Sequence, residues 1–256
     1  MTDERFTAFA RKIRERRPAL GYWVVLDAPP ATERIARLGY DYVVLDGQHG
    51  LLGYSGILQG LTAIDAAGTA VGLVRVEANN ATPIGRALDA GAGGVIVPLV
   101  DTAADAAAAV SAARYPPTGR RSYGPTRAGL RVGPAPVDSD ATVVVLAMIE
   151  TAAGLANVDE ICLVPGLDGV YVGPSDLRLA IGGVTPTDPA LDLDFEAALG
   201  RIRQAAAGAG IAAGIHTFDG ATARRRLAEG FTFASVDGDL GHLVGVAATQ
   251  LETAQS

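Results

Sequence analysis

The stretch Gly169-Val-Tyr-Val-Gly-Pro-Ser-Asp176 decides the fold, together with Met148-Ile-Glu150 shortly before it. Glu150 closes the apolar run that begins at Thr142, and Asp176 closes the run that begins at Val170. Apolar runs of this kind are typical of buried parallel strands, and α/β folds place their chemistry at the C-terminal ends of such strands. If the two strands are neighbours, their carboxylates could hold one divalent cation.

Eight apolar runs along the chain are predicted strands, and alanine-rich helical stretches alternate with them. The runs are 22–27, 41–46, 71–76, 94–100, 142–150, 169–172, 211–216 and 231–236. Helix start signals support the alternation: Thr102 precedes Ala103–Ala113 with Asp105 three residues on, Thr151 precedes Ala152–Leu163, and Asp219 precedes Ala221–Glu229. Eight βα units in one chain predict a closed (β/α)₈ barrel rather than a doubly wound sheet.

The length and composition fit one α/β domain over residues 1–256. The chain has 256 residues, 49% hydrophobic residues and 19% charged residues, which describes a compact globular protein rather than a disordered one. Residues 1–20 are expected to form an N-terminal helical arm. The segment 115–140 is far longer than an ordinary connection between a helix and a strand, and it contains Arg120, Arg121, Tyr123 and Arg127. We interpret it as an active-site loop. The alternative is a surface excursion or a subunit contact.

The charge and the rare residues exclude several classes of function. A net charge of −7 opposes binding to nucleic acid or an anionic membrane. The N-terminus has no apolar signal core and no apolar run is long enough to span a bilayer, so we expect a cytoplasmic protein. Cys162 is the only cysteine, which excludes a cysteine metal site, and Lys12 is the only lysine and precedes the first strand. This argues against a Schiff-base mechanism, which needs a lysine inside the pocket.

The residues at the predicted strand ends form a set rich in carboxylates. These positions hold Asp27, Asp46, Arg75, Glu150, Asp176, His216 and Asp237, with His49 just after Asp46. Mg²⁺ and Mn²⁺ prefer one or two protein carboxylates, with waters and substrate oxygens in the other positions. Glu150 and Asp176 are the candidate metal ligands, and the alternative is that either carboxylate caps the helix that follows it.

Three further features indicate how an anionic substrate is handled. His49 lies between glycines after the second strand, where an imidazole can transfer a proton, although a lone histidine is often structural. Arg75 ends the third strand, and a buried guanidinium needs an anion, either a substrate oxygen or an internal carboxylate. The turn Gly173-Pro174-Ser175 leads from strand to helix and offers free backbone amides to a substrate carboxylate.

Five ordered motifs give the chain a family resemblance from about Gly21 to Asp239. They are Asp41-Tyr-Val-Val-Leu-Asp-Gly-Gln-His49, Gly91-Ala-Gly-Gly-Val-Ile-Val-Pro-Leu-Val100, Arg114-Tyr-Pro-Pro-Thr-Gly119, Ile149-Glu-Thr151 and Leu167-Asp-Gly-Val-Tyr-Val-Gly-Pro-Ser-Asp-Leu177. With these motifs the chain resembles the class II, metal-dependent 2-keto-3-deoxy acid aldolases of the hydroxy-oxo-heptanedioate aldolase and citrate lyase β group.

The resemblance implies a fold, a cofactor and a reaction. It implies a single-domain (β/α)₈ TIM barrel in a homohexamer, with the last helix exchanged between subunits. It implies that Glu150 and Asp176 bind Mg²⁺, Mn²⁺ or Co²⁺, which pyruvate chelates. Arg75 would stabilise the enolate, and His49 would be the acid/base, oriented by Asp89 of an adjacent subunit. Asp46 belongs to the same catalytic group, and Gly173, Pro174, Ser175, Arg75 and Met148 form the substrate-binding set.

The expected reaction is the reversible retro-aldol cleavage of a 4-hydroxy-2-oxo acid to pyruvate and an aldehyde. Two residues depart from the family pattern: Gln48 stands where the family usually has glutamate, and Met148 stands where it usually has glutamine. The enzymatic alternatives are a decarboxylase, a C–C ligase or a CoA-ester lyase that uses the same metal-bound enolate. A catalytically weak barrel that acts as a binding protein is the alternative from another class.

Overall fold

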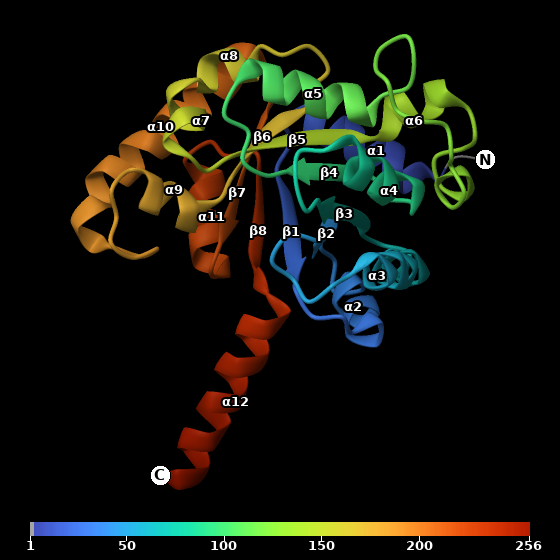
Figure 1. Ribbon diagram of the computed structural model, residues 1–256. Helices are drawn as coiled ribbons and strands as arrows, with labels where there is room; N and C mark the ends of the chain where they lie inside the picture. The colour runs from blue at the N-terminus through green and yellow to red at the C-terminus, as the bar shows by residue number, and fades with distance from the viewer. Residues whose placement is uncertain (1–2) are drawn as a thin grey trace.

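The computed structural model describes residues 3–256 as a closed barrel of eight parallel strands in sequence order (Figure 1). This confirms the predicted (β/α)₈ TIM-barrel fold in a single domain. The strands are β1 (Ala19–Val24), β2 (Tyr42–Asp46), β3 (Val71–Arg75), β4 (Gly94–Val97), β5 (Val144–Ile149), β6 (Gly169–Val172), β7 (Ala212–Thr217) and β8 (Phe233–Gly238).

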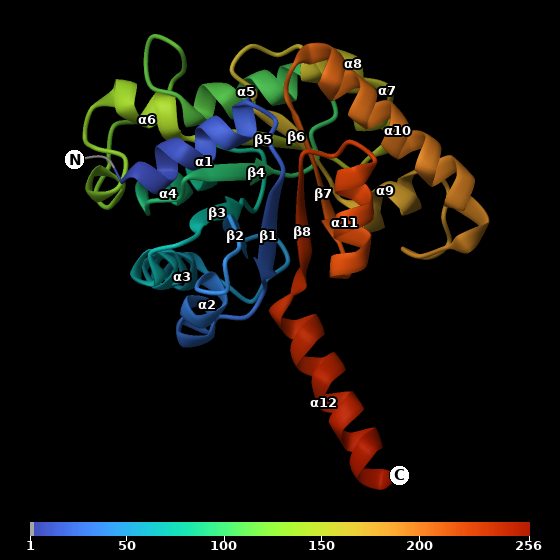
Figure 2. The same cartoon turned by 180° about the vertical axis from the view of Figure 1, so that it is seen from behind.

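Helices surround the barrel, and one of them leaves it. They are α1 (Glu4–Arg14), α2 (Pro29–Ala36), α3 (Tyr54–Ala67), α4 (Ala81–Asp89), α5 (Ala103–Ala113), α6 (Pro136–Thr142), α7 (Ala152–Ala156), α8 (Val158–Cys162), α9 (Pro174–Ala180), α10 (Asp192–Ala209), α11 (Gly220–Ala228) and α12 (Asp239–Gln255), with 3₁₀ turns at Ala128–Leu130 and Pro189–Leu191. Both views show α12 extending away from the body, with the C-terminus at its tip (Figure 2). Among residues 3–256, no helix has the length and apolar character needed to cross a membrane.

The strands point alternate side chains into and out of the barrel. On β2, Tyr42 and Val44 belong to the inner cluster, whereas Val43 and Leu45 pack in the outer layer. The same period of two residues continues along the strand, so Asp46 follows Tyr42 and Val44 on the inner side. The last inward position of a strand therefore faces the C-terminal mouth.

Helix α1 packs against the inner cluster of the barrel. Phe6, Phe9 and Ile13 are buried and belong to the same cluster as the inward side chains of the strands. The ring of Phe9 lies 5.7 Å from the ring of Tyr42, measured between centroids. The predicted arm 1–20 is thus helical over Glu4–Arg14, but its last two residues already belong to β1.

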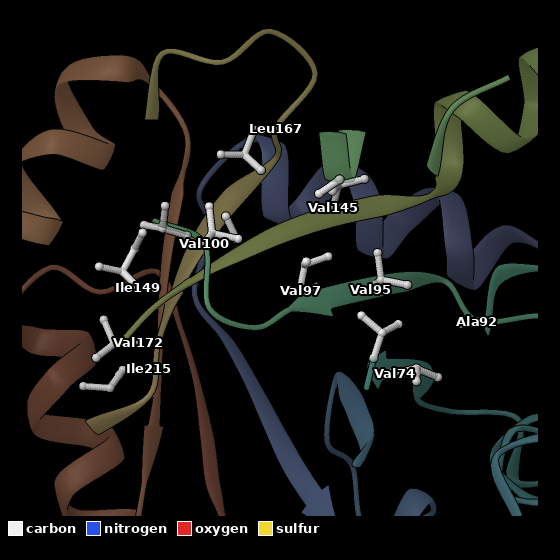
Figure 3. Packing of buried hydrophobic residues seen from close by; sticks show 14 of the residues in the cluster. Val74, Ala92, Val95, Val97, Val100, Val145, Ile149, Leu167, Val172 and Ile215 are labelled. Carbon is white, nitrogen blue, oxygen red and sulfur yellow. The ribbon is translucent and has the colours of Figure 1, made fainter. Parts of the chain in front are cut away.

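A second apolar layer fills the space between the strands and the outer helices. Val74, Val95 and Val145 are register partners on three consecutive strands and all belong to this layer (Figure 3). Parallel strands covered by helices are buried on both faces, so they appear in the sequence as continuous apolar runs.

The predicted elements are confirmed, with differences at their ends. Two strands end three residues earlier than predicted: β1 ends at Val24 rather than Asp27, and β4 ends at Val97 rather than Val100. The predicted helix 152–163 is two short helices, α7 and α8, which meet at Asn157. The N-caps are as expected: Thr102 forms a capping box with Asp105, and Asp219 accepts a 2.7 Å hydrogen bond from the Thr222 amide.

The long segment 115–140 packs away from the barrel mouth. Arg121 donates to Asp89 on α4 at 2.7 Å, while Arg127 and Arg131 both bind the buried carboxylate of Asp65 on α3. The Arg131 carbonyl accepts from the Asp3 amide at 2.7 Å. These bonds fasten the segment to α1, α3 and α4 of its own chain, and its role as an active-site loop stays a prediction.

A substitution at Gly21 would show how tightly side chains are packed inside the barrel. A Cβ atom at this position would lie 2.1 Å from the ring of Tyr42, which is fully buried and cannot move aside. We expect Gly21→Ala to lower the free energy of unfolding by about 1–3 kcal/mol, measured by denaturant titration. Gly85→Ala on α4 is the matched control, because its Cβ meets no atom within 4 Å and should raise stability by about 0.5–1 kcal/mol. Equal stabilities of the two variants would contradict this account of the core.

Candidate active site

A cavity of about 190 Å³ opens where the C-terminal ends of the strands converge. The sequence predicts seven of the residues that line it, namely His49, Arg75, Met148, Gly173, Pro174, Ser175 and Asp176, and the others are Trp23, His216 and Phe218. Residues from β1 to the end of β7 therefore share one site, because parallel strands bring all their C-terminal ends to one face.

Arg75 and Asp46 form a buried ion pair at the floor of the cavity. Register pairs these two residues on β2 and β3, and both side chains point inward. Arg75 Nε donates to Asp46 Oδ1 at 2.8 Å and Arg75 Nη2 donates to Asp46 Oδ2, so the pair is bidentate. The guanidinium also lies over the ring of Trp23, 5.1 Å from its centroid. The arrangement fixes the plane of the guanidinium.

Asp46 also shapes the loop that holds His49. Its Oδ1 accepts from the amides of Gln48 and His49 at 3.0 and 3.1 Å, and its Oδ2 accepts from Trp23 Nε1 at 3.1 Å. Burial alone would raise the pKa of Asp46, but the hydrogen bonds and the charge of Arg75 outweigh it and lower the pKa. The carboxylate is ionised, and both of its oxygens accept hydrogen bonds from neighbouring groups. Asp46 therefore positions these neighbours.

Glu150 follows β5 and is almost fully buried beside the cavity. Its Oε1 accepts a 2.8 Å hydrogen bond from the amide of Leu99. Leu99 has a φ of 53°, which a branched side chain rarely adopts, and this strained backbone directs the amide at the carboxylate. A Cβ on Gly173 would lie 2.5 Å from the other oxygen, Oε2, so only glycine fits beside Glu150.

The carboxylates of Glu150 and Asp176 form a donor set that suits a divalent cation. Burial raises the pKa of Glu150, and the nearby negative charge of Asp176 raises it further, while the Leu99 amide and Arg75 act in the opposite direction. A cation between the two carboxylates would relieve this repulsion. No cluster of three or more metal-binding side chains occurs among residues 3–256. Two carboxylates with open positions are the donor set that Mg²⁺ and Mn²⁺ commonly use.

The first turn of α9 supplies backbone donors at the cavity wall. Pro174 begins the helix and has no amide hydrogen, and the Leu177 amide already donates to the Gly173 carbonyl at 3.0 Å. The amides of Ser175 and Asp176 are therefore the free donors of this turn. Met148 supplies an apolar wall beside Gly173, because a Cβ added to that glycine would approach the Met148 methyl at 2.9 Å.

Two histidines face the cavity in different environments. The ring of His49 makes no hydrogen bond to the described part of the chain and is exposed, so it is accessible to a substrate. His216 packs edge-on against Trp23, with ring centroids 5.1 Å apart, and its Nδ1 is buried without a partner among residues 3–256. Burial lowers the pKa of His216 to about 4, so this ring is neutral at pH 7.

Sequence reasoning missed part of the cavity wall, and the prediction that Asp89 acts from an adjacent subunit stays a prediction. Trp23 was not predicted as a site residue, because the prediction placed the end of the first strand at Asp27, whereas the strand ends at Val24. His216 belongs to the set predicted at the strand ends but was given no part in the site, and Phe218 lies beyond the predicted strand. Asp89 does not line the cavity of its own chain, because it ends α4 and binds Arg121.

The barrel and its mouth, with two carboxylates, an arginine and a histidine around one cavity, define a class of (β/α)₈ enzymes that act on small anionic substrates. Residues 19–245 match the family model described as HpcH/HpaI aldolase/citrate lyase. The chain belongs to this family, and it is a carbon–carbon lyase.

Relatives of known name and structure agree with this assignment. The chain is 42% identical to a hydroxypyruvate/pyruvate aldolase of Rhizorhabdus wittichii over 91% of this chain and 92% of the relative. It is 38% identical to a 4-hydroxy-2-oxovalerate aldolase of Novosphingobium aromaticivorans, over 80% and 79% of the two chains. A crystal structure of a family member from Burkholderia cenocepacia superposes with a TM-score of 0.88 at 30% identity, covering 98% of this chain and 100% of the other.

His216 makes stability depend on pH. Its pKa is about 4 in the folded protein and about 6.5 in the unfolded chain, so the unfolded chain binds the proton more tightly. The contribution is fully present above pH 6.5 and is lost as the pH falls towards 4. We expect His216→Gln to remove about 2 kcal/mol of the acid-induced loss in unfolding free energy. Urea titrations at pH 7 and pH 5 measure it, and identical pH dependence in both proteins would contradict it.

Proposed function

We propose that this protein is a divalent-metal-dependent pyruvate aldolase, which cleaves a 4-hydroxy-2-oxo acid reversibly to pyruvate and an aldehyde. The observation that supports this most directly is the pair Glu150 and Asp176, two carboxylates that repel each other beside the cavity that Asp176, Arg75 and His49 line. The names of two relatives, a hydroxypyruvate/pyruvate aldolase and a 4-hydroxy-2-oxovalerate aldolase, support the same substrate class. The expected compartment is the cytoplasm.

Glu150 and Asp176 would hold the metal ion, with Mg²⁺, Mn²⁺ and Co²⁺ as the candidates. When bound, such an ion acts as a Lewis acid that polarises the keto group of the substrate. Glu150 is prepared for this role, because the Leu99 amide fixes one of its oxygens and leaves the other beside Gly173. Asp176 is exposed on the first turn of α9, where waters and substrate oxygens can share the site.

Arg75 stabilises the negative charge that develops on the keto oxygen when the bond between C3 and C4 breaks. Asp46 acts as its positioning residue, since the bidentate pair and the contact with Trp23 keep the guanidinium in place before the substrate arrives. A preorganised cation of this kind lowers the barrier because it needs no reorientation during the reaction.

His49 moves the proton of the reaction. In the cleavage direction it accepts the proton of the C4 hydroxyl, the electron pair of the C3–C4 bond passes into the enolate, and C3 is then protonated to give pyruvate. The amides of Ser175 and Asp176 receive the substrate carboxylate at the start of α9. Met148 lines the same wall with an apolar thioether side chain. The Oε1 atom of Gln48 is buried and has no hydrogen-bond partner among residues 3–256.

We propose that the working unit is a homohexamer in which α12 is exchanged between subunits. Helix α12 has no buried residue, and its apolar side chains Leu240, Leu243, Val244, Val246 and Leu251 are all exposed. Such a helix needs a cover, because large exposed apolar patches mark contact surfaces. The same assembly would bring Asp89 and the segment 115–140 to the site of a neighbouring subunit, where Asp89 would orient His49.

The metal proposal predicts a specific loss in Glu150→Ala. Removing one of two carboxylate ligands should abolish Mn²⁺ binding in calorimetry and lower aldol cleavage by at least about a hundredfold. Glu160→Ala is the matched control, since Glu160 is exposed on α8 and outside the cavity, and it should behave like the wild type. Aldol activity that persists after EDTA treatment would contradict the proposal.

The assembly proposal predicts that a charge on the exposed face of α12 separates the subunits. In Leu243→Asp the buried carboxylate at the interface would be costly, so the sedimentation coefficient should fall at equal protein concentration. Thr249→Asp is the comparison on the same helix, because its hydroxyl already bonds the Gly245 carbonyl and is not part of the apolar set. If the wild type sediments as a monomer, the hexamer is wrong.

A further inference from the structure

A cavity of about 210 Å³ lies at the N-terminal ends of β7 and β8, on the face of the barrel opposite the active site. Ile211 and Thr232 in its wall directly precede these two strands, while Arg16 follows α1 and Arg203 belongs to α10. The cavity shares no residue with the active-site cavity and is slightly larger than that cavity of about 190 Å³. It therefore has room for a small ligand rather than for a single water molecule.

Arg16 has a backbone conformation that suits glycine better than arginine. Its φ is 55°, in the left-handed region, where a side chain costs free energy. Among residues 3–256, the guanidinium of Arg16 makes one hydrogen bond, to the Ala207 carbonyl at 3.4 Å, which is long for such a bond. This weak contact does not explain an arginine at a strained position, and it leaves most of the N–H donors of Arg16 available to a ligand.

Arg203 brings a second guanidinium to the same cavity, and the fold uses few of its donors. Its Nη1 donates to the Glu229 carbonyl, while its Nε is buried without a partner and its Nη2 makes no hydrogen bond to residues 3–256. The nearby carboxylates of Glu196 and Glu229 bind Arg226 instead, at 2.6 and 2.8 Å. The charge of Arg203 is thus not matched by a carboxylate of its own within the described residues.

The wall of the cavity carries an excess of positive charge. Its only acidic side chain among residues 3–256 is Glu15, and this carboxylate pairs with Arg17 at 3.2 Å. Neither Arg16 nor Arg203 forms an ion pair with an aspartate or glutamate of the described chain. Two unpaired guanidinium groups on one concave surface favour an anion with more than one negative charge.

We propose that this cavity binds the phosphate group of a small molecule, with Arg16 and Arg203 as the recognition residues. A phosphate group carries a charge of about −1.5 to −2 at pH 7, which matches two guanidinium groups, and each guanidinium can donate two parallel hydrogen bonds to it. The site binds its ligand without reacting with it, because barrel enzymes carry their chemistry at the other face. The assignment is independent of the aldolase activity proposed above.

The test is calorimetric titration of the full chain with inorganic phosphate and with glycerol 3-phosphate at constant ionic strength. Arg16→Gly removes one guanidinium and suits the left-handed backbone, so the affinity should fall about tenfold or more while the melting temperature without phosphate does not fall. Arg203→Gln should weaken binding by a similar factor. Arg201→Gln is the matched control, because Arg201 lies on the same helix but does not line the cavity, and it should bind like the wild type.

The two titrants distinguish the sources of the phosphate group. Binding of inorganic phosphate alone identifies the free ion as the ligand, whereas binding of glycerol 3-phosphate identifies a phosphomonoester. The proposal is overturned if the wild type binds neither anion saturably, or if the affinity is unchanged in Arg16→Gly or in Arg203→Gln, since binding at the active site would not respond to these variants. An equal loss in Arg201→Gln also overturns it, because the effect would then reflect net charge rather than this cavity.

Discussion

The bidentate pair between Arg75 and Asp46 is the interaction on which the site depends. A guanidinium inside a barrel is costly without a partner, and the partner here is the register neighbour on the adjacent strand. The same carboxylate receives Trp23 and the amides that shape the His49 loop. One buried charge pair therefore sets the positions of three groups at the cavity: the arginine, the tryptophan and the loop that holds the histidine.

The other side of the cavity is organised by backbone rather than by charge pairs. Leu99 is held in a strained conformation so that its amide meets Glu150, and Gly173 leaves room for the same carboxylate. Arg75 and Glu150 thus lie beside one small cavity with opposite charges, each held by a neighbouring segment: Arg75 by Asp46 on β2, and Glu150 by the Leu99 amide that follows β4. In the proposed function, this arrangement leaves one charge for the keto acid and the other for the cation, since no direct contact joins Arg75 and Glu150 within residues 3–256.

Much of the site was predictable because barrel enzymes carry their functional residues at the C-terminal ends of the strands. Asp46, Arg75 and Glu150 end apolar runs, and the alternation of side chains sends such final residues to the mouth. Trp23, Leu99 and Phe218 were not predictable in this way. Trp23 depended on where the first strand stops, Leu99 contributes only a backbone amide, and Phe218 lies in a loop whose path no periodicity describes.

The sequence by itself determined the eight strands, the barrel and most of the residues of the candidate site, because apolar periodicity and strand-end carboxylates are local patterns. The tertiary structure alone decided where the segment 115–140 lies, since its arginines bind Asp65 and Asp89, far away in the sequence. It also decided that Asp89 stays outside the cavity of its own chain and that Trp23 and Phe218 join the wall of that cavity. Long-range pairing of this kind leaves no local pattern, because it depends on how the loops and helices pack around the closed barrel.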